Sequence, residues 1–238
     1  MRMPEFLPAR RRAAADAFTL IELMVVIGVL AIIMAISIPS YLRSKMVGNE
    51  TAAVATLRTF VTLEATWRQN DVDRNNLGDY WTADVSGFYR IEASPAGSAR
   101  SVAQVDAAIC SADDNKLGAG AAIAGAVLDS GVPAANLLAF AQNGAKSGYL
   151  FRAMVNDLST APVSVYAADP AGNGQLWTNN ALFGFQARPE KYNSTGLNTI
   201  VVNQAGVIYK RDFGDNNSAN ANFWPPANPS TTGWGPIQ

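Results

Sequence analysis

The pattern of hydrophobic and polar residues predicts one long N-terminal helix with two different halves. Residues 18–38 are almost uninterruptedly apolar and have the sequence FTLIELMVVIGVLAIIMAISI, with Glu22 as their one charged residue. About 21 residues at the ~1.5 Å rise of an α-helix span the ~30 Å apolar layer of a bilayer. The run therefore predicts a membrane-spanning helix over residues 18–39.

Residues 40–70 continue the helical periodicity in amphipathic form. Apolar residues recur at spacings of three, four and seven and predict one buried stripe. The stripe consists of Met46, Ala53, Leu57 and Phe60, with Val54 and Val61 beside it. The other faces carry Lys45, Glu50, Arg58, Glu64 and Arg68. Because an apolar stripe needs a partner, we expect this half of the helix to pack on a sheet.

Pro39 separates the two halves. Proline removes one backbone donor and crowds the preceding turn, so we expect a bend or local melting of the helix at this residue. The two halves would then form one helix of about 50 residues, roughly 75 Å long. A complete break into two separate helices is the alternative.

Alternation with a period of two appears in the second half of the chain and predicts an antiparallel sheet within residues 149–214. The clearest strands are residues 149–154 and 163–167. A hairpin is expected where residues 200–203 and 207–210 flank a short segment that ends in glycine. With three or four strands, the predicted fold class is α+β, a long N-terminal helix packed on a small antiparallel sheet.

Two segments have no regular pattern. Residues 71–148 are rich in Ala, Gly, Ser and Asp and predict a variable connection between the helix and the sheet. Residues 215–238 form a tail too rich in proline for regular structure, although Phe223, Trp224 and Trp234 are costly to leave in water. We expect an ordered strap over the sheet, and the alternative is an exposed contact for a subunit or a ligand.

Two clusters of oxygen-bearing side chains are candidate calcium ligands. They comprise Asp71, Asp73, Asn75 and Asp79 after the helix, and Asp212, Asp215, Asn216 and Asn217 near the tail. The first cluster departs from the EF-hand pattern, because Asn76 stands where that loop has Gly and Thr82 where it has Glu. Asp and Asn are also the residues that turns require. We therefore favour a solvated turn after the helix and predict no cofactor.

The residue inventory excludes several classes of function. The chain has 238 residues with 49% hydrophobic content, which is enough for one compact domain beyond the apolar run. It has no histidine and one cysteine, Cys110, which removes Ser-His-Asp and Cys-His catalysis and zinc sites that contain histidine. The small apolar neighbours of Cys110 favour a buried side chain over a reactive thiol. A net charge of −1 gives no sign of a nucleic-acid partner.

Glu22 needs a physical explanation. A carboxylate inside a membrane helix costs roughly 2.5 to 3.5 kcal/mol at the helix centre and usually marks a function or a partner. If the chain were cut between Ala17 and Phe18, the new α-amino group would supply a cation. The amine of one copy could then pair with Glu22 of the next copy and set their stagger.

These residues resemble the processing site of type IV pilins and of the pseudopilins of type II secretion. The resemblance rests on Arg10, Arg11 and Arg12, on Ala17, on the hexapeptide FTLIEL that begins at Phe18, and on Pro39. In that family a membrane peptidase removes the short basic leader, here residues 1–17, and methylates the new N-terminus, here Phe18. The family usually has Gly before the cut, so Ala17 implies slower cleavage at worst.

The resemblance implies a pilin-like fold and a structural role rather than an enzyme. After cleavage, residues 18–39 would leave the lipid and pack into a helical filament, in which Glu22 sets the register. The implied partners are membrane lipid, further copies of the chain, a prepilin peptidase, a platform protein and an assembly ATPase. The implied location is the inner membrane, crossed once with a cytoplasmic N-terminus and with the globular domain periplasmic or extracellular.

Three alternatives keep the apolar run but change its function. A pseudopilin of type II secretion shares every N-terminal feature with a pilus subunit. A Sec signal peptide would have a shorter apolar core, about 7 to 15 residues, followed by small residues at a cleavage site. A plain membrane anchor for an extracytoplasmic binding module fits the length but leaves Glu22 unexplained, and it predicts an uncut chain.

Overall fold

The chain divides into two compact units, Met1–Leu42 and Arg43–Gln238. The structure is a computed structural model. It describes residues 18–72, 77–82, 84–85, 88, 104–114, 144–159, 164–166, 178–215, 223–225 and 229–237. Helix α1 (Leu20–Asn70) begins in the first unit and ends in the second.

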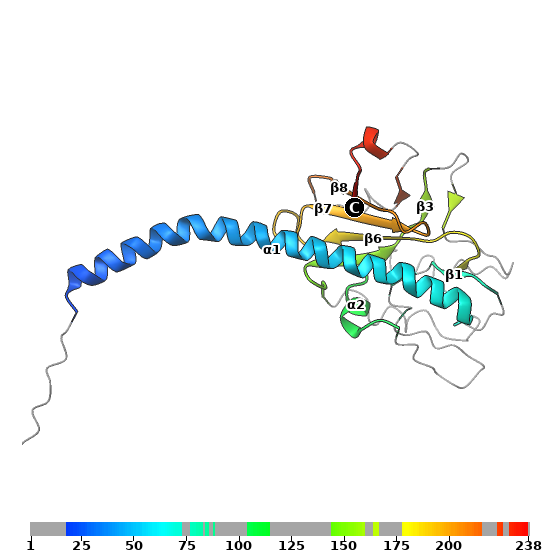
Figure 1. Cartoon of the computed structure of the whole chain (residues 1–238), viewed down its shortest axis with the longest axis horizontal. Coiled ribbons are helices and arrows are strands. Elements are labelled where there is room, and N and C mark those ends of the chain that lie inside the picture. The colour runs from blue at the N-terminus through cyan, green and yellow to red at the C-terminus, as the bar shows by residue number, and fades with distance from the viewer. Residues whose placement is uncertain are drawn as a thin grey trace, which may run out of the picture. The chain divides into compact units, whose positions relative to one another are not determined.

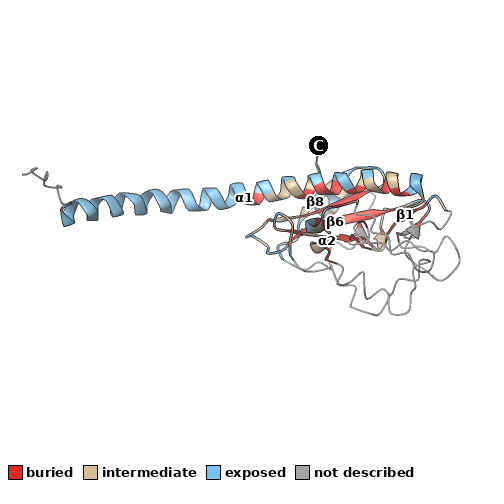
Figure 2. Ribbon diagram, turned by 90° about the horizontal axis from the view of Figure 1, so that it is seen from below, coloured by how far each residue is buried: buried red, intermediate tan, exposed pale blue. Residues whose placement is uncertain are grey.

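Helix α1 continues through Pro39 without interruption. The alternative of two separate helices is therefore wrong, and a bend at Pro39 stays a prediction. Every residue from 18 to 45 is exposed, which Figure 2 shows as the pale blue part of the helix. From Met46 onward one face of α1 is buried.

The buried face of α1 contains the predicted stripe and three residues that the stripe did not include. It consists of Met46, Ala53, Thr56, Leu57, Phe60, Glu64 and Trp67. Lys45, Arg58 and Arg68 are exposed as predicted. The prediction that Glu64 lies on a polar face is wrong, because β1 (Tyr80–Trp81) covers that side of the helix and leaves the Glu64 side chain fully buried.

A five-stranded antiparallel sheet forms the centre of the C-terminal unit. In sheet order its strands are β10 (Gly235–Ile237), β8 (Ile208–Asp212), β7 (Asn198–Asn203), β6 (Gly184–Pro189) and β2 (Tyr149–Ala153). The second half of α1 lies along this sheet (Figure 1). The predicted fold class is confirmed, and so is the hairpin, because β7 pairs with β8 and Gly206 takes a φ of 71° in the turn between them.

Strand β6 was not predicted, although it lies between β7 and β2. It contains the alternation Phe185, Gln186, Ala187, Arg188, a four-residue signal for a strand. Both faces of β6 are buried, and Arg188 is held by Asp114, with 2.6 Å between Nη2 and Oδ1. A buried polar face made the segment look like a loop in the sequence.

Aromatic side chains join α1 to one face of the sheet. The ring of Phe60 lies 5.7 Å from that of Phe151 on β2 and 5.1 Å from that of Phe185 on β6, between centroids. Phe88 and Trp67 extend the same cluster, with 5.8 Å between their rings. Such pairs add about 0.5 to 1.5 kcal/mol each beyond the area that they bury. The amphipathic half of α1 is thus part of the core of the domain.

The C-terminal tail completes the sheet. Strand β10 pairs antiparallel with β8, after a short 3-10 helix, η3 (Pro229–Thr232). The prediction that the tail lacks regular structure is therefore wrong, since Pro236 is accommodated in an edge strand, where a missing donor costs little. Trp224 and Trp234 are buried against Val201, on the face of the sheet opposite α1, so an exposed contact through these two side chains is also wrong.

The remaining elements are short. They are α2 (Ala107–Ser111), β3 (Asn156–Asp157), β4 (Ser164–Val165), β5 (Thr178–Asn179) and β9 (Phe223–Trp224). β5 pairs with β1, and β3 pairs with β4 and β9. The predicted strand at residues 163–167 is thus wrong in its place, because the two residues that form β4 pair outside the five-stranded sheet.

Candidate assembly segment

The exposed part of α1 begins with a reciprocal cap between Thr19 and Glu22. The Thr19 N–H donates to Glu22 Oε2 at 2.9 Å, and the Thr19 hydroxyl donates to the same oxygen at 2.8 Å. The Glu22 N–H donates in turn to Thr19 Oγ1 at 3.3 Å. This capping box satisfies backbone donors that the first turn of a helix otherwise leaves open.

The cap gives Glu22 a role within its own chain that the sequence interpretation missed. The signal was present as Thr-Leu-Ile-Glu, the pattern of a Ser or Thr followed three residues later by Glu. Both donors of Thr19 use Oε2 of Glu22. The carboxylate is therefore compatible with a second partner at its other oxygen.

The processing site lies at the edge of the described residues. Ala17 lies outside them, whereas the side chain of Phe18 is 85% exposed and precedes the first helical residue, Leu20. Cleavage before Phe18 would leave the capping box intact, since Thr19 and Glu22 both lie after the cut. Processing and methylation at these residues stay predictions.

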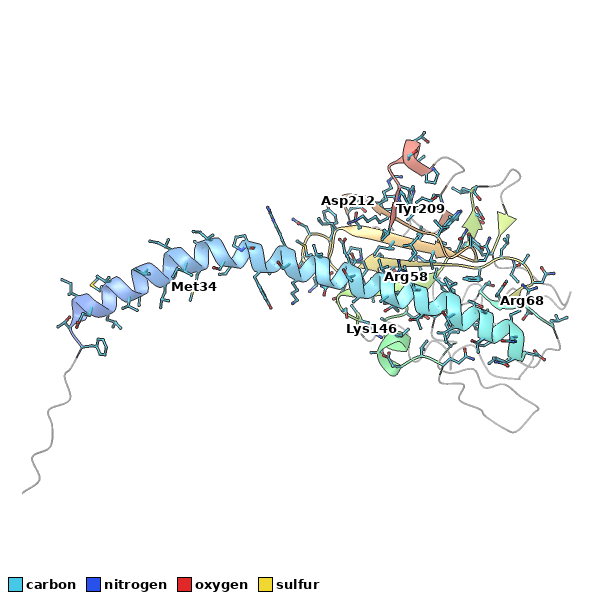
Figure 3. All side chains as sticks on the ribbon, in the orientation of Figure 1. Met34, Arg58, Arg68, Lys146, Tyr209 and Asp212 are labelled. Atoms are coloured by element: carbon cyan, nitrogen blue, oxygen red, sulfur yellow. The ribbon has the colours of Figure 1, made fainter. Side chains whose placement is uncertain are left out.

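Large apolar side chains project from all sides of this part of α1. Between Phe18 and Leu42 their exposed fractions run from 46% at Leu30 to 85% at Phe18. Met34, labelled in Figure 3, is one of them. An exposed apolar surface of this extent marks contact with a membrane or a protein. By length and composition, α1 contains a stretch that can cross a membrane.

Polar side chains attach α1 to the sheet soon after it enters the second unit. Asn49 Nδ2 donates to the carbonyl of Thr195 at 2.7 Å. Glu50 Oε1 accepts from Leu197 N at 3.1 Å, and Glu50 Oε2 accepts from Asn198 Nδ2 at 3.0 Å. The loop between β6 and β7 is thereby fixed to the helix.

The candidate calcium ligands are only partly described. Asp73, Asn75, Asn216 and Asn217 lie outside the described residues. Asp212 uses its carboxylate locally, accepting from Gly214 N at 2.8 Å and from the Tyr192 hydroxyl at 3.3 Å. Within the described ranges, no group of three or more Asp, Glu or Cys residues is placed to hold a metal ion.

Cys110 lies in α2, but its side chain is outside the described part of the structure. The prediction of a buried thiol therefore stays a prediction. Its helical neighbour Ile109 is buried and belongs to the main core, and so does Ala112.

Comparison with known families gives matches in two different parts of the chain. Residues 12–38 match the prokaryotic N-terminal methylation motif. Residues 120–237 match a family described as a protein of unknown function (DUF2950). No curated protein and no solved structure matches the chain. The first match covers Ala17, Phe18 and Glu22, so the motif coincides with the exposed apolar part of α1.

Proposed function

Because residues 12–38 carry the prepilin motif of type IV pilins and pseudopilins, we propose that the protein is a structural subunit of a type IV pilus-like filament. The observation that carries the proposal is that this motif lies on a helix whose large apolar side chains are exposed. Such a helix is stable in lipid or against copies of itself. A subunit with unlike upper and lower surfaces then builds an open fibre.

Processing prepares the subunit for assembly. A prepilin peptidase cuts after Ala17 and methylates the amine of Phe18. The leader carries four arginines, at positions 2, 10, 11 and 12, which keep it on the cytoplasmic side before the cut. Ala17 is small enough for the cut, although it replaces the more usual glycine. The motif itself is typical of a structural subunit and not of an enzyme family.

Glu22 serves two partners in sequence. In the single chain its carboxylate accepts from Thr19. In the filament it also receives the positively charged amine of Phe18 from the next copy. The low dielectric constant between packed apolar helices strengthens this ion pair, and the cost of an unpaired carboxylate there penalises any other stagger. Glu22 thus sets the register of assembly.

The site of storage is the inner membrane. The motif and the long apolar helix indicate membrane anchoring, and the arginine-rich leader places the N-terminus in the cytoplasm. The domain that begins near Arg43 is periplasmic before assembly and forms the outer surface of the filament afterwards. A platform protein and an assembly ATPase move the subunit from lipid into the fibre.

A pseudopilin of type II secretion is the second candidate. It shares the whole N-terminal constellation, and the presence of one cysteine favours it slightly, since no disulfide can form within the chain. Fibres visible on the cell surface would favour the pilus subunit, and their absence with loss of a secreted protein on deletion would favour the pseudopilin. An anchored binding module that uses Trp224 or Trp234 is disfavoured, because both side chains are buried.

The test is the intact mass and N-terminal sequence of the protein isolated from its native membrane. A chain that begins at Phe18 with a methylated amine is the expected result. A chain that begins at Met1 would overturn the proposal and leave a simple membrane anchor as the better explanation. Ala17→Gly and Ala17→Tyr give matched variants, for which we expect retained and lost cleavage, respectively.

A further inference from the structure

The second unit carries basic side chains where α1 enters it. Arg43 and Lys45 follow directly after Leu42, and both are exposed. Lys191 is exposed in the loop between β6 and β7. None of these three cations has a role in the core or in the cap at Glu22.

The loop that carries Lys191 is held against this part of α1 by the hydrogen bonds of Asn49 and Glu50. Glu50 follows Lys45 by little more than one helical turn, about 7.5 Å at ~1.5 Å per residue. Lys191 therefore belongs to the same end of the unit as Arg43 and Lys45.

The acidic groups at this end are mostly engaged. Glu50 binds the backbone of Leu197 and the side chain of Asn198. Asp212 accepts from Tyr192 and from a backbone N–H. Glu190 is the exposed carboxylate that opposes the cations. The side chains that can reach outward from this end are thus predominantly basic.

We propose that Arg43, Lys45 and Lys191 bind the phosphate groups of an anionic membrane surface where the membrane-spanning helix leaves the bilayer. The proposal rests on the membrane anchoring proposed above. The polar headgroup layer is about 5 to 8 Å thick on each side of the apolar core. Arg43 and Lys45 lie within that distance of Leu42 along the helix, and long basic side chains extend readily toward phosphates.

An anionic surface fits this end better than a second copy of the chain. The cluster continues directly from the apolar segment, so it meets the headgroups as soon as the helix is inserted. Each basic residue next to such a surface strengthens the contact by roughly fivefold. Cleavage removes the arginines of the leader, and Arg43 and Lys45 then become the basic residues nearest to the apolar run.

The test measures how fast an amine-reactive acylating reagent modifies each lysine of the full chain in lipid nanodiscs. Nanodiscs of phosphatidylcholine alone are compared with nanodiscs that contain phosphatidylglycerol as well. We expect the anionic lipid to slow modification of Lys45 and Lys191 at least threefold at low salt. Lys210 on β8 is the internal reference, and molar salt should abolish the difference because it screens the charges.

Matched variants separate the cluster from the general charge of the domain. Arg43→Gln with Lys45→Gln should restore the modification of Lys191, whereas Arg58→Gln with Arg68→Gln should leave it slow. Arg58 and Arg68 are exposed further along α1 (Figure 3). Glu190→Gln should increase the protection, since it removes the opposing charge.

Three results would overturn the proposal. Equal modification of Lys191 in both lipids would exclude docking on an anionic surface while the anchoring stands. Protection that follows the number of chains per nanodisc, and not the lipid charge, would assign the cluster to contact between copies. A chain that fails to enter the nanodisc at all would overturn the anchoring on which the proposal rests.

Discussion

The side chain of Glu64 is fully buried under the loop that leads into β1. Its Oε2 accepts from the backbone N–H of Trp81 at 2.9 Å, while its Oε1 has no hydrogen-bond partner. Burial raises the pKa of Glu64 well above its usual range, the bond from Trp81 opposes this, and the neighbouring charge of Asp79 adds to it. A carboxyl group in this environment is most stable when it is protonated.

Glu64 therefore predicts a specific dependence of stability on pH. Its contribution to the free energy of unfolding is fully present below the unfolded-state pKa, near 4.5, and is lost as the pH rises toward the raised folded-state pKa. The loss is at most about 1.4 kcal/mol per pH unit, the value for one proton. Glu64→Gln should flatten this dependence and stabilise the protein at neutral pH, as measured by urea unfolding between pH 4.5 and 8.

Glu190→Gln is the matched control for Glu64→Gln, because Glu190 is exposed. We expect this variant to keep the wild-type dependence on pH. An unchanged pH profile in Glu64→Gln would show that another group causes the dependence.

Glu22 makes a second prediction at the level of single residues. Glu22→Gln keeps an acceptor for Thr19 but removes the charge, so the leader should still be cleaved while filament yield falls at least ~10-fold, the factor that about 1.4 kcal/mol produces. Thr19→Val removes the hydroxyl of the cap and keeps the charge, so its filament yield should stay close to that of the wild type. The measurement is the amount of sheared filament per cell against total subunit.

Equal loss of filaments in both variants would assign Glu22 to capping alone. Normal filaments from Glu22→Gln would contradict the proposed ion pair with the amine of Phe18. A shared readout of leader cleavage, by mass, shows that each variant reached the membrane.

Among the secondary elements, the loop between β6 and β7 is the part that joins helix and sheet. It is bound to α1 through Asn49 and Glu50, and Gly196 lies against the ring of Tyr149 on β2, whose hydroxyl donates to the carbonyl of Asn198 at 3.0 Å. The turn before β2 closes the same contact at Gly148. The position of α1 on the sheet thus depends on close approach of backbone segments and not on apolar packing alone.

Gly148→Ala should test that close approach. Gly148 has a φ of 72°, and a Cβ there would lie 2.7 Å from Thr195 Cβ and 2.9 Å from Asn49 Nδ2. Strain at positive φ and displacement of the loop should together lower the free energy of unfolding by about 2 to 4 kcal/mol. Chemical denaturation measures the change.

Gly206→Ala is the control for backbone strain. Gly206 has a φ of 71° but open space around its Cβ position. We expect a loss of only about 1 kcal/mol, the cost of a left-handed conformation for alanine. Equal losses in the two variants would show that the contact between the turn and the loop contributes nothing.

For the whole molecule, the division into two units separates two kinds of apolar surface. The buried apolar residues of the core all come from the second unit, starting with Met46. The described residues of the first unit are exposed throughout. The second unit thus contains the interactions for folding, and the first supplies a surface for lipid or for other copies.

This division predicts that a chain that starts at Arg43 still folds. Its melting temperature should stay within about 4 °C of the full-length value in detergent, since a change of 1 kcal/mol shifts a domain of this size by roughly 2 to 4 °C. It should no longer sediment with vesicles, whereas the full chain should. Thermal unfolding by circular dichroism and vesicle sedimentation provide the two measurements.

A chain that starts at Arg58 is the contrasting variant. It lacks Ala53 and Leu57, two residues of the core, and should be unfolded or strongly destabilised. If removal of residues 1–42 had the same effect, the first unit would contribute to the fold.

Local order along the chain was enough to determine the N-terminal half of this protein. The apolar run, the stripe from Met46 to Phe60 and the processing motif each depend on residues that are neighbours in sequence, and α1 and the family match at residues 12–38 confirm them. The hairpin of β7 and β8 was predictable for the same reason, since its strands are joined by a short turn.

Only the tertiary structure decided which polar residues are buried and which segments pair over long distances. Strand β6 is stabilised by two neighbouring strands and by Asp114, β10 joins an edge from the far end of the chain, and Glu64 is covered by Trp81. Periodicity reports which face of an element is apolar. It does not report what covers the other face, because that depends on contacts between residues far apart in sequence.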